Sequence, residues 1–102
     1  AKVVNKARLG VDSRSRASAL RQVHAELDAL AAVAGHPSIV ELACAFDGRM
    51  QIVVVLELCP GGELFDFLVE QGELTEADCA CILAQVASAL AHMHAHGYMH
   101  RD

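Results

Sequence analysis

The sequence predicts an α+β fold in which a small antiparallel sheet precedes a purely helical part. Apolar residues recur at spacings of three and four in residues 19–34 and 76–96, as in amphipathic helices, whereas larger apolar residues alternate with smaller or charged ones in 40–46. Pro60-Gly61-Gly62 separates the sheet-forming sequence from the helical sequence. We therefore expect two parts, residues 1–59 and residues 60–102.

The composition indicates a folded chain with a thin apolar core. Of the 102 residues 54% are hydrophobic, but 18 residues are alanines and 4% are aromatic. Alanine favours helices and buries little surface. No apolar stretch approaches the roughly 20 residues that cross a bilayer, and the first residues lack the layout of a signal peptide. We therefore expect no membrane partner and a cytosolic or nuclear protein.

The first half of the chain predicts a strand, a connection and a helix. Lys2–Lys6 is a short apolar-rich segment typical of the end of a strand, and the polar, basic residues 10–18 indicate a connection. An amphipathic helix is expected over residues 19–34, because its apolar residues fall on one face. Gly35 is a fitting helix stop, and Pro37 follows it.

A β-hairpin is predicted next. Alternation over residues 40–46 would place Val40, Leu42, Cys44 and Phe46 on one half-buried face. Asp47-Gly48 is a turn dipeptide, and the β-branched run Ile52–Leu56 suits a central strand.

Two helices are expected after the hairpin. The first covers about residues 63–69, and the second runs from Glu76 to about His96, with Thr75 as its N-cap and Gly97 at its end. We expect the longer helix to bury one stripe, formed by Cys79, Ile82, Leu83, Val86, Leu90 and Met93.

Glu26 breaks the apolar pattern of the first predicted helix. At 100° per residue it lies about 40° from Leu30, at the edge of the apolar stripe. A partly buried carboxylate without a partner costs roughly 1–3 kcal/mol or more, and Lys2 on the preceding strand is the nearest basic residue among apolar neighbours. The alternative is a glutamate that simply reaches solvent at the edge of the helix.

The ionisable run His100-Arg101-Asp102 is a second anomaly. An aspartate on a loop, held by an adjacent basic residue, can accept a proton from a bound hydroxyl group. As a bare tripeptide it fits a disordered polar terminus equally well.

The cysteines and histidines predict no metal site. The cysteines form no CxxC pair, so we expect reduced thiols rather than structural zinc at Cys44, Cys59, Cys79 and Cys81. His92 and His96 share a side of the helix, which leaves a small helical metal-binding protein as a distant alternative. Because they lie off the apolar stripe, we expect them to be solvated, and we expect His94 to be a hydrogen-bonded core histidine.

The charge is unevenly distributed along a chain of net charge −5. Residues 1–22 hold six basic groups and one acidic group, for a net +5, and residues 23–102 have a net charge of −10. The basic stretch lacks interleaved aromatic residues. A solvated face is therefore the preferred interpretation, and nucleic-acid binding the minor one.

Six features of the sequence occur in a characteristic order. The first three are Ala1-Lys2, Glu26 and Gly35-His36-Pro37-Ser38-Ile39-Val40. They are followed by the predicted hairpin, by Leu56-Glu57-Leu58-Cys59-Pro60-Gly61-Gly62-Glu63-Leu64-Phe65-Asp66 and by Tyr98-Met99-His100-Arg101-Asp102. This order resembles the catalytic domain of eukaryotic protein kinases, most of all the calcium/calmodulin-dependent and calcium-dependent group. The resemblance covers all 102 residues. It implies a partial small lobe, with antiparallel strands and one helix, in 1–59, and the first helices of the large lobe in 60–102.

The resemblance implies roles for individual residues. Lys2 would pair with the phosphates of ATP and with Glu26, and Leu56 would be the gatekeeper of the adenine pocket. Glu57 and Cys59 would offer backbone hydrogen bonds to adenine. Glu63 would reach the ribose and, in kinases that prefer basic substrates, an arginine of the substrate.

The end of the chain carries the remaining implied roles. Asp102 would be the catalytic base that orients the acceptor hydroxyl group, and Arg101 places the chain among kinases whose activation loop is held by a phosphate. Leu30, Leu42 and His100 match three of the four side chains that stack between the two lobes of such kinases.

The same resemblance implies ATP and Mg²⁺ as cofactors, a protein substrate with basic residues near its acceptor, and a calcium sensor module in the parent protein. The glycine-rich phosphate loop is expected before Ala1, and the metal-binding motif and the activation loop after Asp102. We therefore interpret the chain as an inactive fragment of a serine/threonine kinase. The alternative is a non-catalytic, kinase-like scaffold, against which the combination of Lys2, Glu26 and Asp102 argues.

Overall fold

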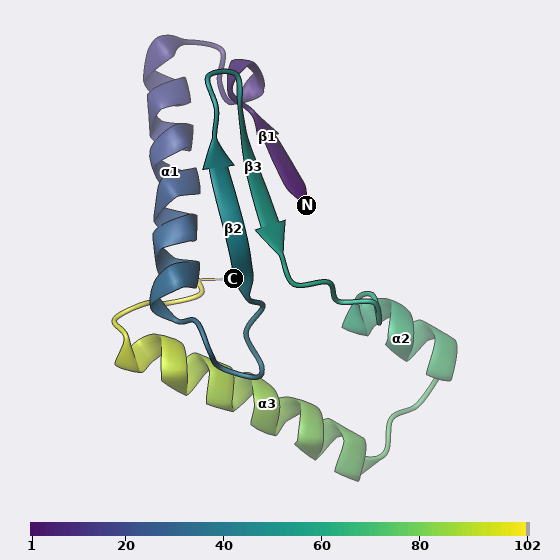
Figure 1. Ribbon diagram of the computed structural model, residues 1–102. Coiled ribbons are helices and arrows are strands. Elements are labelled where there is room, and N and C mark those ends of the chain that lie inside the picture. The colour runs from purple at the N-terminus through teal and green to yellow at the C-terminus, as the bar shows by residue number, and fades with distance from the viewer. Residues whose placement is uncertain (102) are drawn as a thin grey trace. The chain divides into compact units, whose positions relative to one another are not determined.

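The computed structural model describes residues 1–101. Its elements are β1 (Lys2–Asn5), the 3₁₀ turn η1 (Lys6–Arg8), α1 (Ser13–Ala32), β2 (Leu42–Asp47), β3 (Gln51–Leu56), α2 (Leu64–Gln71) and α3 (Glu76–Ala95). They form two compact units, Ala1–Glu57 and a second that begins at Leu58 (Figure 1). The predicted α+β class and kinase-like element order are confirmed.

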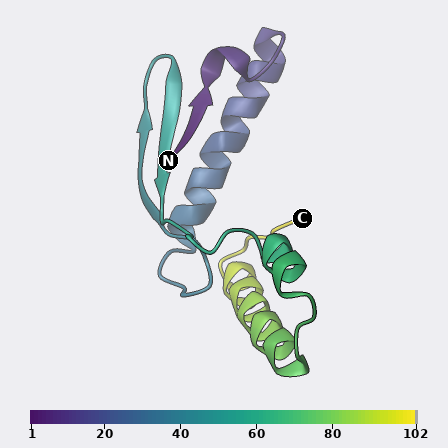
Figure 2. The same ribbon diagram turned by 90° about the vertical axis from the view of Figure 1, so that its right-hand side faces the viewer.

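The first unit is a three-stranded antiparallel sheet with one helix beside it. The strand order is β1-β3-β2, so β3 pairs with both neighbours, with Lys2 opposite Val54 and Phe46 opposite Val53. Helix α1 runs alongside the sheet in both views (Figures 1 and 2). Among residues 1–101 the buried apolar side chains are Val33, Ile52 and Val54, so the core is as thin as the alanine-rich composition predicts.

The prediction for the start of α1 was wrong. Residues 13–18 belong to the helix, not to a connection. Asp12 is the N-cap, because its carboxylate accepts a hydrogen bond of 2.7 Å from the backbone N–H of Ser15. The strong helix formers Arg14, Arg16 and Ala17 lie among the first five residues of the helix, and the first helical turns stay exposed. An apolar period therefore could not reveal them.

The alternation predicted for β2 was also wrong. The strand begins at Leu42, not Val40, it includes Asp47, and its register shifts between Leu42 and Cys44. An extra residue of this kind reverses the faces of the side chains that follow. Leu42 is half-buried, whereas Cys44 and Phe46 are exposed.

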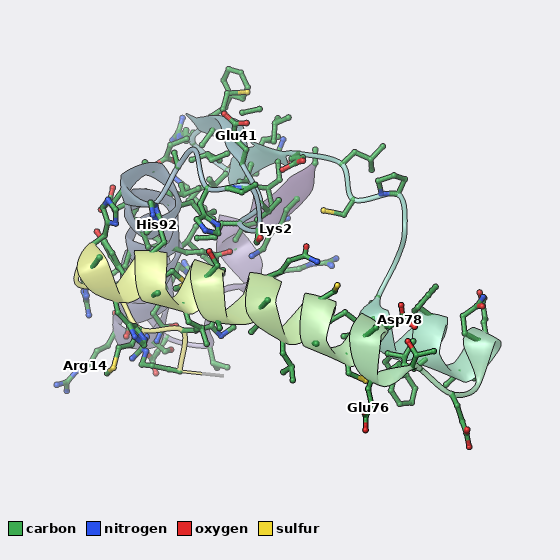
Figure 3. The ribbon with its side chains drawn as sticks, turned by 90° about the horizontal axis from the view of Figure 1, so that it is seen from below. Lys2, Arg14, Glu41, Glu76, Asp78 and His92 are labelled. Atoms are coloured by element: carbon green, nitrogen blue, oxygen red, sulfur yellow. The ribbon has the colours of Figure 1, made fainter. Side chains whose placement is uncertain are left out.

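In the second unit, α3 begins with a capping box. The Thr75 hydroxyl oxygen accepts a hydrogen bond from the Asp78 backbone N–H, and the Asp78 carboxylate accepts one from the Thr75 backbone N–H, both at 3.2 Å. Figure 3 shows Asp78 and Glu76 in this first turn. The N-cap predicted at Thr75 is confirmed, and Gly97 follows the helix with a φ of 79° that favours glycine.

The stripe predicted for α3 is not buried. Ile82, Leu90 and Met93 are half-buried, whereas Cys79, Leu83 and Val86 are exposed. The periodicity correctly predicts one apolar face, but burial also needs a partner surface over that face. Among residues 1–101 no helix is long and apolar enough to cross a membrane.

Candidate functional site

An ion pair joins β1 to α1. The Lys2 ammonium nitrogen lies 2.9 Å from Glu26 Oε1 and 3.2 Å from Oε2, so one cation donates to both oxygens of the carboxylate. Both side chains are about half exposed. The predicted contact is present, and the alternative of a glutamate that meets only solvent was wrong. The contact holds the Lys2 ammonium group beside α1, while about half of the Lys2 side chain stays accessible to solvent.

Leu56 and Glu57 lie where the chain leaves the sheet. Leu56 is half-buried at the end of β3, opposite Leu42. The Glu57 backbone N–H donates to the Glu41 carbonyl oxygen at 2.9 Å, and the Glu57 carboxylate accepts from the Glu41 backbone N–H at 3.2 Å. These two bonds hold the Glu57 backbone just beyond the end of β3.

Cys59, Glu63 and Arg101 belong to the second unit, so the structure does not relate them to Lys2. Cys59 and Glu63 are exposed, and the Glu63 carbonyl oxygen accepts from the Phe67 backbone N–H at 3.1 Å in the first turn of α2. Arg101 adopts a φ of 63°. Non-glycine residues rarely adopt this left-handed conformation, and such residues cluster at functional sites. Asp102, the predicted base, lies outside the described residues.

A second polar cluster in the first unit was not predicted from the sequence. The Asp47 carboxylate contacts the Lys6 ammonium group through Oδ1, and Oδ2 lies 3.0 Å from His24 Nε2. Hydrogen bonding to Lys6, and secondarily to His24, lowers the pKa of Asp47. In the sequence, Asp47 is explained by its place in the turn dipeptide Asp47-Gly48, and His24 is explained as a histidine on an exposed helix face. Neither residue therefore indicates a partner. No pattern in the sequence marks these contacts, because Asp47 lies 41 positions from Lys6 and 23 positions from His24.

The metal predictions concern the second unit. His92 and His96 share one side of α3 as predicted, with ring centroids 4.3 Å apart, and His96 Nδ1 lies 2.8 Å from the His92 carbonyl oxygen. His96 is exposed as predicted, whereas His92 is half-buried, and His94 is exposed rather than part of a core. Within residues 1–101 no group of three or more His, Cys, Asp or Glu side chains could hold a metal ion.

Comparison with known proteins gives one consistent family. The model of the protein kinase domain matches residues 1–102. Myosin light chain kinase A from Dictyostelium discoideum is 39% identical over 101 residues, which is 99% of this chain and 32% of that protein. Calcium-dependent protein kinase 9 from Oryza sativa subsp. japonica is 41% identical over 80 residues, covering 78% of this chain and 14% of the relative.

A third relative, calcium/calmodulin-dependent protein kinase type 1 from Macrobrachium nipponense, is 43% identical over 67 residues, which is 66% of this chain and 19% of that protein. The chain therefore spans less than a third of the length of these three curated relatives. The matches agree with the motif order of the sequence, including its likeness to the calcium-dependent groups.

Proposed function

The chain belongs to the protein kinase domain family, and on that premise we propose that its parent transfers the γ-phosphate of ATP to serine or threonine hydroxyl groups of proteins. The observation that carries the proposal is the bidentate contact of Lys2 with Glu26. The two residues are 24 positions apart in the sequence, and the fold of the first unit brings them together.

The residues of the first unit suit the phosphates of a nucleotide. Phosphoryl transfer passes through a loose transition state, so catalysis consists mainly of positioning and charge neutralisation. The Lys2 side chain is half exposed and its ammonium group is held by a carboxylate, which would suit it to bind phosphate oxygens. Within residues 1–101 no group of three or more His, Cys, Asp or Glu side chains could hold Mg²⁺.

The remaining roles follow the family motifs. Leu56 would border the adenine ring, and the backbone of Glu57 and Cys59 would bond to its edge. Glu63 would bind the ribose and an arginine of the substrate, while Asp102 would accept the proton of the acceptor hydroxyl group. The left-handed backbone of Arg101 supports a functional role for the segment that leads to Asp102.

The names of the relatives support the finer assignment. Their printed names describe myosin light chain, calcium-dependent and calcium/calmodulin-dependent kinases. From these names we extend to the parent a protein substrate and a calcium-sensing module. The basic residues near the acceptor follow from the role proposed for Glu63. The serine/threonine preference rests on the same names.

The experiment that tests the proposal compares the full-length parent with its Asp102→Asn variant. A positioned base contributes about 10²–10⁴ to the rate, so transfer of labelled phosphate from ATP to a basic serine peptide should fall by that factor. An Asp66→Asn variant, which changes an exposed carboxylate of α2, should keep the wild-type rate.

Turnover of Asp102→Asn within a few-fold of the wild type would remove Asp102 as the base. A parent with no transfer at all would favour the scaffold interpretation. The 102-residue chain alone should give no transfer above its own Asp102→Asn background.

A further inference from the structure

We infer that His24 and Asp47 are positioning residues, which fix the rotation of α1 about its own axis and thereby hold Glu26 against Lys2. The inference rests on the proposed function, because the pair they hold is the proposed phosphate-binding pair. It concerns the cluster of Lys6, His24 and Asp47, called the Asp47 cluster.

The His24–Asp47 contact ties α1 to the β2 edge of the sheet, whereas the Lys2–Glu26 pair ties it to the β1 edge. Glu26 contacts β1, whereas His24 contacts Asp47 at the end of β2, and β1 and β2 are the two edge strands. Lys6 is the third member of the cluster. It directly follows β1, and its ammonium group contacts the same Asp47 carboxylate. Its backbone N–H also donates to the Met50 carbonyl oxygen at 3.0 Å.

The two ties lie on opposite flanks of the helix. His24 and Glu26 are two residues apart, which is about 200° around an α-helix. The half-buried residues Val23, Leu27 and Leu30 define the stripe between them. A roll of α1 that brings one flank toward the sheet carries the other flank away. The two ties together therefore resist rolling in both directions, which neither achieves alone.

The chemistry of the contact is well defined. The pKa of Asp47 is lowered by its hydrogen bonds to Lys6 and His24, so the carboxylate is ionised at neutral pH. An ionised carboxylate only accepts hydrogen bonds, and Nε2 of His24 must therefore carry the proton at 3.0 Å. An arginine at position 24 could donate in the same way, which supplies a conservative replacement.

The test uses the full-length parent with the substitutions His24→Ala, His24→Arg and Arg21→Ala. Arg21 is an exposed residue of the same helix and is absent from the Asp47 cluster. His24→Ala should lower kcat/KM for ATP by about two- to five-fold, the range for exposed ion pairs. His24→Arg should restore it, and Arg21→Ala should leave it unchanged.

Combination with Glu26→Gln separates positioning from a merely structural role. If His24 acts through the Lys2–Glu26 pair, His24→Ala should cause no further loss of kcat/KM in a Glu26→Gln background. An equal loss in both backgrounds, or an inactive His24→Arg, would overturn the inference.

Amide hydrogen exchange across residues 13–32 gives a readout that does not require catalysis. Exchange in this segment should be faster in His24→Ala than in the wild type, and His24→Arg should reverse the change. Unchanged exchange would overturn the inference even in an active kinase. A parent that transfers no phosphate, yet shows this exchange pattern, would refute the proposed function and leave the restraint on α1 intact.

Discussion

Lys2 combines two features at the level of a single residue: it pairs with Glu26, and it keeps about half of its side chain exposed. We predict that Lys2→Met in the parent lowers kcat by about 10²–10³, the loss seen when one group that stabilises transition-state charge is removed. Steady-state kinetics at saturating ATP would measure it. Arg8→Met, which changes an exposed basic residue of η1, is the matched control, and equal activity in both variants would contradict the assignment.

Asp47 gives a prediction on pH. Its pKa is lowered below the usual 3.8 by Lys6 and then by His24. A lowered folded-state pKa contributes stability that is present above the usual pKa and is lost as the pH falls through the folded value. The free energy of unfolding should therefore fall less steeply below about pH 4 in Asp47→Asn than in the wild type. Urea titrations of the parent between pH 3 and 6 would measure this, with Asp28→Asn on α1 as the control.

At the scale of elements, the start of α3 depends on the capping box. Thr75→Ala removes the hydroxyl group that accepts from the Asp78 backbone N–H, and loss of such a cap costs about 1 kcal/mol. We predict a lower free energy of unfolding of the parent and faster amide exchange in the first turn of α3. Thr75→Ser keeps the hydroxyl group and should behave like the wild type. Equal stability of all three proteins would show that α3 does not need the cap.

The elements also show how far sequence patterns reach. Every predicted helix and strand exists, because periodicity and local caps are properties of contiguous residues. The bulge in β2 was not predictable in this way, and the early start of α1 was marked by the N-cap Asp12 but not by an apolar period. The bulge depends on the pairing of β2 with a neighbouring strand, and the first turns of α1 have no apolar partner to mark them.

The candidate site also has one part that was predictable from the sequence and one part that was not. The Lys2–Glu26 pair was predictable, because a partly buried carboxylate at the edge of an apolar stripe is costly unless a cation pairs with it. The Asp47 cluster was not, because its members come from η1, α1 and β2 and are individually ordinary surface residues. Their significance follows from their common position in the folded unit.

At the scale of the whole molecule, the 102-residue chain exposes many large apolar side chains. Within residues 1–101 these include Phe65 at 70%, Leu83 at 66% and Val86 at 49% exposure, while three apolar residues form the buried core. So small a core offsets little of the conformational entropy lost on folding. We predict that the chain alone unfolds without a sharp transition, as followed by circular dichroism on heating. A cooperative melt would contradict this.

The strand order β1-β3-β2 also sets a sequence of assembly during synthesis. Lys2 pairs opposite Val54, so β1 cannot join β3 until some 52 further residues have been made. At 5–20 residues per second this wait lasts about 3–10 s. The hairpin of β2 and β3 closes within microseconds once both strands are free. We therefore expect β1, which carries Lys2, to join the sheet after the hairpin has formed. A chaperone bound to the nascent β1 would then delay the Lys2–Glu26 contact while leaving the hairpin intact.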